Sequence, residues 1–546
     1  MQKPMPDFPS RSKSILRILL AGLTVLAILA ALGYLIVYFY VAARRAGYPY
    51  ELEWIEGGFV GQVGRILAGQ PVYGPPSIAF TPFLYTPLYF YLSAAAARIV
   101  GAGFLPLRLV SVISSLVALT GIFTLVFRRS RNLTASFLAA GLLAASYRIT
   151  GAWLDIARVD SLAIALLVLF CLALPPSPSR FRWLLAGLLA GLMVLTKQSM
   201  AIAVAPFFAV HLIQYRARAL WMAAGFLLPL GLAALYLNIS SEGWFTFYTI
   251  ELLWQQTEWL GRDVIVGFWK TDILRHYFAA LGIAAAGLFL IFRDRRGEFW
   301  EWSALLAGAL LCSFLARIKS GGYDNVLLPA VVMIAILLGI GWDRISGSLL
   351  KNPNVFRDAA GIALTVAALY QFYHLRYNPA DQLPADRNYQ TGKAFVQYLA
   401  EFPGEVYVPF HTEYAAMAGK PAYAHQAALW DVLRGETDNR GKQMLAREIE
   451  ETLRTRRFDA ILLDGDGQWN FLYGLEDFYI LQADPLPPDF GPTPLTGWQI
   501  SPRLIFLPKA FNQSALLSPE IGLEYLDNDF IWEKLFPYLN TSHRFV

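Results

Sequence analysis

Charged side chains and cysteines are both scarce in this sequence. Of its 546 residues only 16% are Asp, Glu, Lys or Arg, whereas 56% are hydrophobic, and the mean hydropathy is +0.44. A soluble protein of this length would have too few polar residues to cover its surface. The two cysteines, Cys171 and Cys312, lie in apolar runs, which excludes a disulfide framework and a cysteine-based metal site. We therefore predict an integral membrane protein.

The sequence also lacks a heptad repeat and a Gly-X-Y repeat, so a coiled coil and a collagen-like chain are excluded, and its high apolar content excludes disorder. The formal net charge of +5 is small for this length, and the charges lie mostly in short loops between apolar segments. Such a distribution sets membrane topology. We expect the lipid bilayer as a partner and no nucleic acid.

Basic residues between the apolar segments predict the topology. Residues 15–41 form a first span that is preceded by more basic residues than follow it, which places the N-terminus in the cytoplasm. If the later basic clusters also face the cytoplasm, only one further crossing fits between the first span and Arg128. Residues 84–100 therefore lie along the membrane or re-enter it. The eleven predicted spans are residues 15–41, 107–127, 133–150, 161–176, 182–196, 199–214, 218–238, 276–293, 300–317, 326–342 and 358–375.

An odd number of spans puts the C-terminal part of the chain on the outer side. We predict a transmembrane domain at residues 1–375 and an extracytoplasmic soluble α/β domain at 376–546, where charge, Pro and Gly become frequent. Within the second domain, residues 404–409 and 458–464 are expected to be strands, with an amphipathic helix at 438–456 between them. The protein should be a multi-pass protein of the cell inner or plasma membrane.

Ionisable side chains from four separate connections are predicted to reach the outer face. They are Glu51, Glu53 and Glu56, then Asp155, Arg158 and Asp160, then Lys197, and finally Lys319, Tyr323, Asp324 and Asn325. Each one alone fits an ordinary interfacial charge that reaches for water about as well as it fits a functional role. Lys197 is the exception, because it sits between two apolar runs and its ammonium needs an anionic partner.

The order of several short motifs resembles the GT-C superfamily of polyprenyl-phosphate-sugar-dependent glycosyltransferases, nearest to its aminoarabinose transferase and protein mannosyltransferase groups. The resemblance spans roughly residues 50 to 330. It implies a polytopic α-helical fold with about 11 spans, two membrane-surface helices at 59–69 and 84–100, and a C-terminal soluble α/β domain. The motifs are Glu56-Gly57, Arg65, Gly69, Val72-Tyr73, Tyr85-Thr86-Pro87, Arg158-Val159-Asp160, Thr196-Lys197 and Asn325 to Pro329.

The resemblance implies an inverting transfer of a sugar from a polyprenyl phosphate to a glycan, lipid or protein acceptor on the outer face. One carboxylate would serve as general base, and fixed cations would stabilise the phosphate leaving group. Glu56 takes the place of the catalytic residue of the family, which is usually Asp, so Glu53 remains a rival. Asp160 and Asp155 would assist as catalytic carboxylates, and a divalent cation is left open. The expected substrate-binding residues are Lys197, Arg158, Glu53, Tyr85, Lys319, Tyr323 and Asn325.

Two other classes of function compete with this hypothesis. A transporter or flippase of lipid-linked sugars would hold charges at mid-bilayer and show two matching halves. A receptor or assembly subunit without catalytic activity would use Glu56 and Asp160 only for structure. The pair Asp464 and Asp466 looks like the DxD motif of nucleotide-sugar transferases, but Asp-Gly after a strand is more typical of a turn.

Overall fold

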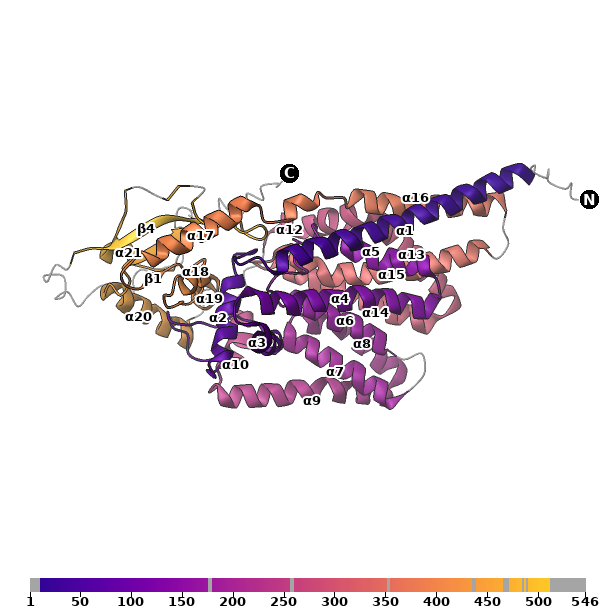
Figure 1. Ribbon diagram of the computed structural model, residues 1–546. Coiled ribbons are helices and arrows are strands. Elements are labelled where there is room, and N and C mark those ends of the chain that lie inside the picture. The colour runs from indigo at the N-terminus through magenta and orange to yellow at the C-terminus, as the bar shows by residue number, and fades with distance from the viewer. Residues whose placement is uncertain are drawn as a thin grey trace, which may run out of the picture.

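The computed structural model describes residues 10–174, 179–255, 260–350, 354–434, 438–464, 471–483, 486–487 and 490–510. Most of this part is a helical bundle, and a small sheet with its own helices lies at one end of the bundle (Figure 1). Each of the eleven predicted spans coincides with one helix. These helices are α1 (Ser10–Ala46), α4 (Phe104–Ser130), α5 (Leu133–Ala145), α6 (Asp160–Ala173), α7 (Arg180–Thr196), α8 (Met200–Tyr215), α9 (Ala217–Ser240), α13 (His276–Asp294), α14 (Arg296–Ile318), α15 (Leu328–Leu350) and α16 (Val355–His374).

Helix length separates these segments into two groups. Six helices of the described chain, α1, α4, α9, α13, α14 and α15, lie in segments long and apolar enough to cross a membrane, whereas α5, α6 and α8 are shorter apolar helices. The chain is therefore a multi-pass membrane protein, and the number of eleven crossings stays a prediction. The N-terminal end of α1 and the sheet lie at opposite ends of the bundle (Figure 1). Which end faces the cytoplasm also stays a prediction.

The centre of the bundle is α15, whose side chains from Val331 to Leu338 are buried on all sides. A helix that is apolar all round belongs in a core. Helices α7 and α9 approach each other most closely through glycines. A Cβ atom at Gly187 would lie 2.0 Å from the Met222 carbonyl oxygen, and one at Gly225 would lie 2.2 Å from that of Leu184. Small residues allow such backbone contact between membrane helices.

Two short helices, α2 (Glu56–Leu67) and α3 (Leu88–Val100), occupy the positions predicted for the membrane-surface helices. They lie at the end of the bundle that faces the sheet (Figure 1). Helix α3 has 13 residues and exposes Ile99 and Val100, so it is apolar but shorter than the roughly 20 residues that a span needs. The predicted outer loop 239–275 is mostly helical where it is described, with α10 (Trp244–Thr246), η1 (Phe247–Glu251), α11 (Leu252–Gln255), α12 (Arg262–Gly267) and η2 (Phe268–Arg275).

The sheet has four strands in the order β1-β2-β4-β3, with β1 parallel to β2 and the other pairs antiparallel. The strands are β1 (Val406–Tyr407), β2 (Ala460–Asp464), β3 (Tyr479–Leu481) and β4 (Pro502–Pro508). The helices around them are α17 (Asp386–Ala400), α18 (Thr412–Met417), α19 (Gln426–Leu433), α20 (Arg440–Arg454) and α21 (Leu475–Phe478). Both predicted strands and the amphipathic helix between them are confirmed. The domain boundary at residue 376 stays a prediction.

Candidate functional site

The charged side chains of the site meet because each lies at the end of a helix. Asp160 is the first residue of α6, and Lys197 follows the last residue of α7. Asn325 lies in a short 3-10 helix, η3 (Asp324–Leu327), that leads into α15. Helix α6 packs against α7, α4 and α15, which brings these ends together. Residues that are far apart in the sequence thus form one cluster next to α2.

The first ion pair of the site joins Glu53 to Arg158. The distance between Glu53 Oε2 and Arg158 Nη1 is 3.0 Å, and both side chains are nearly fully buried. The Arg158 guanidinium also lies over the rings of Phe59 and Trp153, 4.9 and 5.4 Å from their centroids. Its Nε atom has no hydrogen-bond partner among the described residues. Arg158 is therefore held rigidly by ring contacts while part of its donor capacity is unused.

The second ion pair joins Asp160 to Lys197. Lys197 Nζ donates to Asp160 Oδ1 at 2.7 Å, and Asn325 Nδ2 donates to the same oxygen at 3.0 Å. The other oxygen, Asp160 Oδ2, is buried and has no hydrogen-bond partner in the described part of the chain. Asp160 and Lys197 line a pocket whose other walls are mainly apolar, including Ile164, Met200 and Leu328. A polar end and an apolar body are features that a lipid with a charged head could use.

Tyr85 lies between the two ion pairs. Its hydroxyl accepts a hydrogen bond from Arg158 Nη2 at 3.1 Å. The segment around it is fixed to the end of α7, because Thr86 donates to the Val194 carbonyl oxygen at 2.8 Å and Gln198 donates to that of Leu84 at 2.5 Å. The predicted residues Glu53, Arg158, Asp160, Lys197, Tyr85 and Asn325 are thus all in one continuous cluster. We call Glu53–Arg158 and Asp160–Lys197 the site pairs.

Glu56 lies in a different environment from Glu53, although only two residues separate them. Its two carboxylate oxygens bind Arg108 at 3.0 and 2.6 Å, and they accept backbone N–H bonds from Ala157 at 2.6 Å and Leu52 at 2.7 Å. Both Glu56 and Arg108 are fully buried. This carboxylate has its hydrogen-bonding capacity filled by the protein, which favours a structural role for Glu56.

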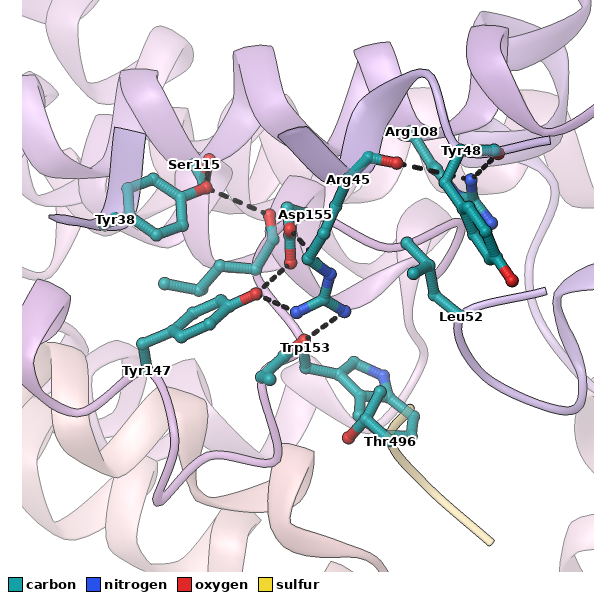
Figure 2. A network of polar contacts seen from close by, with 12 residues as sticks. Tyr38, Arg45, Tyr48, Leu52, Arg108, Ser115, Tyr147, Trp153, Asp155 and Thr496 are labelled. Atoms are coloured by element: carbon teal, nitrogen blue, oxygen red, sulfur yellow. Dashed lines mark hydrogen bonds and ion pairs between the residues drawn. The ribbon is translucent and has the colours of Figure 1, made fainter. Parts of the chain in front are cut away.

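Asp155 is also part of a buried network (Figure 2). Its Oδ2 faces Arg45 Nε at 3.3 Å, and its Oδ1 accepts a hydrogen bond from the Tyr147 hydroxyl at 2.8 Å. Arg45 also donates to Tyr147 and, at 3.4 Å, to the Ala152 carbonyl oxygen. We call Glu56–Arg108 and Asp155–Arg45 the inner pairs. They fix the first two outer loops to α1 and α4, the helices that contain Arg45 and Arg108.

Two further predicted residues lie at the margin of the cluster. The ring of Tyr323 lies 5.0 Å from that of Trp153, and Tyr323 is hydrogen-bonded to Thr496 from the C-terminal part. Lys319 donates from Nζ to the Leu253 carbonyl oxygen at 3.2 Å. Tyr323 is therefore close to the site pairs, whereas Lys319 fixes the outer helical segment.

The pKa values distinguish the carboxylates. Burial raises the pKa of Glu53 to about 7, although Arg158 opposes this shift. Burial also acts to raise the pKa of Glu56, but the Arg108 guanidinium and the two backbone amides outweigh it, and the pKa is lowered. Burial raises the pKa of Asp155 in spite of Arg45. A general base works best with a pKa near the working pH, which favours Glu53 over Glu56.

Sequence reasoning missed the partners of the inner pairs. Arg108 lies inside a predicted span, where an ionisable residue is itself a signal of a buried partner or a function. Arg45 is one of the basic residues that follow the first predicted span, where charge patterning indicates only topology. His411 was also missed, and it joins Glu51 through Nδ1 and Asp464 Oδ2 through Nε2, the latter at 2.8 Å. Asp464, the last residue of β2, is therefore a hydrogen-bond partner of His411. Asp466 lies outside the described residues.

A metal site does not fit these donors. Among the residues that the structure describes, His, Cys, Asp and Glu side chains form no group of three or more that could hold a metal ion. The carboxylates of the site pairs and of the inner pairs are each matched with an Arg or Lys. No catalytic step is therefore assigned to the divalent cation that the sequence left open.

Comparison with known proteins identifies the fold. The family model of dolichyl-phosphate-mannose-protein mannosyltransferase matches residues 84–244. ArnT from Cupriavidus metallidurans, solved with undecaprenyl phosphate, is 13% identical over 91% of this chain and 100% of its own, with a TM-score of 0.58. The archaeal oligosaccharyltransferase AglB from Archaeoglobus fulgidus, solved with an inhibitory peptide and a dolichol-phosphate, is 14% identical over 85% of this chain and 73% of its own, with a TM-score of 0.51. No curated protein matches by sequence. These matches confirm the predicted resemblance: the chain has the GT-C fold.

Proposed function

We propose that this chain is an inverting glycosyltransferase that moves a sugar from a polyprenyl-phosphate donor to an acceptor on the extracytoplasmic face. The chain shares its fold with glycosyltransferases, two of which were solved with polyprenyl phosphates. One observation carries the proposal. The site pairs form a continuous row through Tyr85 at the end of the bundle, and the pocket beside them has one charged end and apolar walls.

Lys197 and Arg158 are the proposed phosphate-binding cations. The ammonium of Lys197 lies in the pocket wall, and Asp160 and Asn325 keep it oriented. The unused Nε–H of Arg158 is a second donor. Fixed cations of this kind stabilise the negative charge that grows on a phosphate as it leaves.

Glu53 is the proposed general base, in place of Glu56. Its carboxylate is buried beside Arg158, and its raised pKa suits proton abstraction near neutral pH. Glu56 has four hydrogen bonds and a lowered pKa, and it is proposed to hold Leu52 and Ala157 in place. Asp160 is proposed to position Lys197, and Asp155 to position Arg45.

The reaction then balances as one displacement. An acceptor hydroxyl gives its proton to Glu53, and the oxygen forms a bond to the anomeric carbon of the donor sugar. The bond between that carbon and the phosphate oxygen breaks, and polyprenyl phosphate leaves with the bonding electrons. Its charge is stabilised by Lys197 and Arg158. A single displacement from the opposite side inverts the configuration at the anomeric carbon.

The transporter hypothesis is less well supported. It requires charges at mid-bilayer, whereas Asp160, Lys197 and Asn325 lie at or beside the ends of helices. The extracytoplasmic location of the reaction rests on the positive-inside topology and stays part of the proposal.

The test is transfer of a radiolabelled sugar by the full chain in nanodiscs, with a panel of sugars on a short-chain polyprenyl phosphate. We expect labelled product and release of polyprenyl phosphate, with an activity that rises with pH through about 7 as Glu53 loses its proton. Glu53→Gln should abolish both the transfer and that pH dependence. Movement of the intact lipid-linked sugar across a liposome membrane without any transfer would support the transporter and overturn the proposal.

A further inference from the structure

A short strap from the C-terminal part of the chain lies directly on Glu53, one member of the site pairs. We define it as residues 495–498, which precede β4. The backbone N–H groups of Leu495 and Thr496 both donate to the Leu52 carbonyl oxygen at 3.0 Å, and Thr496 pairs with Glu53 as an isolated parallel bridge. The Thr496 hydroxyl also donates to the Gly151 carbonyl oxygen. The strap is thus tied to both of the outer loops that carry the site, and Figure 2 shows Thr496 beside Trp153.

The strap touches Glu53 through a glycine. Gly497 has a φ of +75° and lies so close that a Cβ atom would be 2.8 Å from Glu53 Cγ. A larger residue would meet both backbone strain and a clash at this position. The carboxylate proposed as base therefore has Arg158 as an ion-pair partner, and the strap backbone packs directly against its side chain.

The strap ends in an aromatic face. The rings of Trp498 and Trp54 are 5.4 Å apart and perpendicular, and Phe410 lies 6.1 and 6.2 Å from Trp54 and Trp498. His425 donates from Nε2 to the Trp54 carbonyl oxygen at 3.0 Å, which fixes the backbone next to Glu53. Trp498 is nonetheless 39% exposed. A large ring held in one position and left partly open is preorganised to bind another group.

We propose that Trp54 and Trp498 form a binding face for a pyranose ring of the acceptor, so that the acceptor is a saccharide. This inference rests on the proposed function. A pyranose has an apolar face of C–H groups, which stacks on indole rings, and a rim of hydroxyls, one of which would reach Glu53. The face combines the two indole rings with Phe410 and the polar ring of His425, which lies 5.2 Å from Trp54, and aromatic side chains with a few polar groups are typical of small-molecule sites.

The charge distribution separates this face from the proposed lipid site. Arg158 binds Tyr85 through Nη2, and Lys197 lines the apolar pocket. The strap meets the ion pair at its Glu53 end, where Gly497 packs against the side chain. In this proposal, a donor bound at Lys197 and an acceptor bound at Trp498 approach Glu53 from two directions, as a single displacement requires.

Binding is tested without catalysis by saturation-transfer NMR on the full chain in nanodiscs, with mannotetraose, chitotetraose and cellotetraose as probes. We expect at least one probe to bind, and Trp498→Ala to weaken it by about tenfold, with Trp498→Phe intermediate. Trp300→Ala is the matched control, because Trp300 is 52% exposed on α14 and has no place in the site. Equal binding by wild type and Trp498→Ala, or binding of none of the three probes, overturns the inference.

Two further measurements separate the alternatives. Quenching of Trp498 fluorescence by brominated lipids, together with unchanged probe binding in Trp498→Ala, would identify an interfacial anchor and overturn the inference. In the transfer assay, Trp498→Ala should raise the acceptor KM by about tenfold and leave the donor KM unchanged. If the probes bind through Trp498 but no sugar is transferred, the proposed function fails while the saccharide site stands.

Discussion

The inner pairs and the site pairs are neighbours, and both consist of a carboxylate and a basic side chain taken out of water. In the inner pairs, Glu56 and Arg108 are fully buried, and both carboxylate oxygens of Glu56 are occupied by protein donors. In the site pairs, the Lys197 side chain is 16% exposed, and Asp160 Oδ2 lacks a hydrogen-bond partner among the described residues. The Glu56–Arg108 pair therefore differs from the site pairs in unused bonding capacity, and from Lys197 in access. The Asp155–Arg45 pair is intermediate, because it is fully buried while Asp155 Oδ2 and Arg45 Nε also lack a hydrogen-bond partner among the described residues.

This difference indicates how a buried charge is assigned to structure or to function. A buried ion pair contributes to the fold only if the other lone pairs and protons are also satisfied. Glu56 meets that condition with two backbone N–H bonds that tie together the first and second outer loops. Asp160 and Arg158 do not meet it, because Asp160 Oδ2 and Arg158 Nε have no hydrogen-bond partner in the described part of the chain. The following predictions test whether the division holds.

The largest effect is expected for Glu53→Gln. Glutamine keeps the shape and a hydrogen bond to Arg158 but cannot accept the proton, so turnover should fall by about 10² to 10⁴-fold. The melting temperature should also fall, because Arg158 loses its ion-pair partner, so turnover is measured on folded protein. Glu56→Gln is the matched comparison, because it should lower the melting temperature through the lost pair with Arg108. An inactive Glu56→Gln protein with unchanged melting, next to an active Glu53→Gln protein, would restore Glu56 as the base.

A loss of stability is expected for Arg108→Met. The change leaves the Glu56 carboxylate buried without its cation, and the free energy of unfolding should fall by about 3–5 kcal/mol. Chemical unfolding in a mild detergent measures this, with Arg148→Met as a control at an exposed arginine. The double variant Glu56→Leu with Arg108→Met should recover part of the loss, because it leaves no unpaired charge. If Arg108→Met is as stable as the control, the inner pairs do not support the fold.

A smaller loss is expected for Lys197→Met, about 3 kcal/mol, because Lys197 is partly exposed and Asn325 still binds Asp160. A short-chain polyprenyl phosphate should raise the melting temperature of the wild type but not of this variant. Melting curves with and without the lipid measure both the loss of stability and the effect of the lipid. Unchanged stability with an unchanged lipid effect would place Lys197 outside both the ion pair and the phosphate site.

The smallest effect, taken over a single pH unit, is expected at His411, which lies outside both groups. Burial acts to lower its pKa, but Asp464 and Glu51 outweigh this and raise it to about 10. A raised pKa means that the stabilisation is complete below about pH 6.5, the unfolded value, and is lost as the pH rises through about 10. The free energy of unfolding should fall by at most about 1.4 kcal/mol per pH unit in this range. Glu53 and Glu413, with pKa values raised to about 7 and about 8, titrate at lower pH. Melting from pH 8 to 10 should therefore show this decline in wild type and His374→Gln, and not in His411→Gln.

Much of the fold could be predicted from local patterns. The apolar runs and their basic flanks predicted where the helices lie, and the parity of crossings predicts that α3 does not span the membrane. Short apolar segments at 404–409 and 458–464 predicted β1 and β2. The loop 239–275 was missed as helical because interfacial aromatic residues disrupt a simple apolar pattern.

The site could be predicted only as a set of residues. Because they lie in or beside predicted outer loops, five residues were expected at one face of the protein, and the structure groups them there. They are Glu53, Arg158, Asp160, Lys197 and Asn325. The choice between Glu53 and Glu56 was beyond sequence reasoning, because spacing within a motif does not reveal which carboxylate meets Arg108. The strap was missed for the same reason, since residues 495–498 carry no signal that they cross the first outer loop.

The sequence by itself determined the membrane class, the helix positions and the inventory of charges, because hydrophobicity and helix periodicity are properties of neighbouring residues. Only the tertiary structure decided which charges are paired and which keep unused capacity. Desolvation and hydrogen bonding depend on every atom within a few ångströms, and those atoms come from loops up to several hundred residues apart, as between Glu53 and Gly497. Two glutamates in one short loop thus differ in pKa and in proposed role.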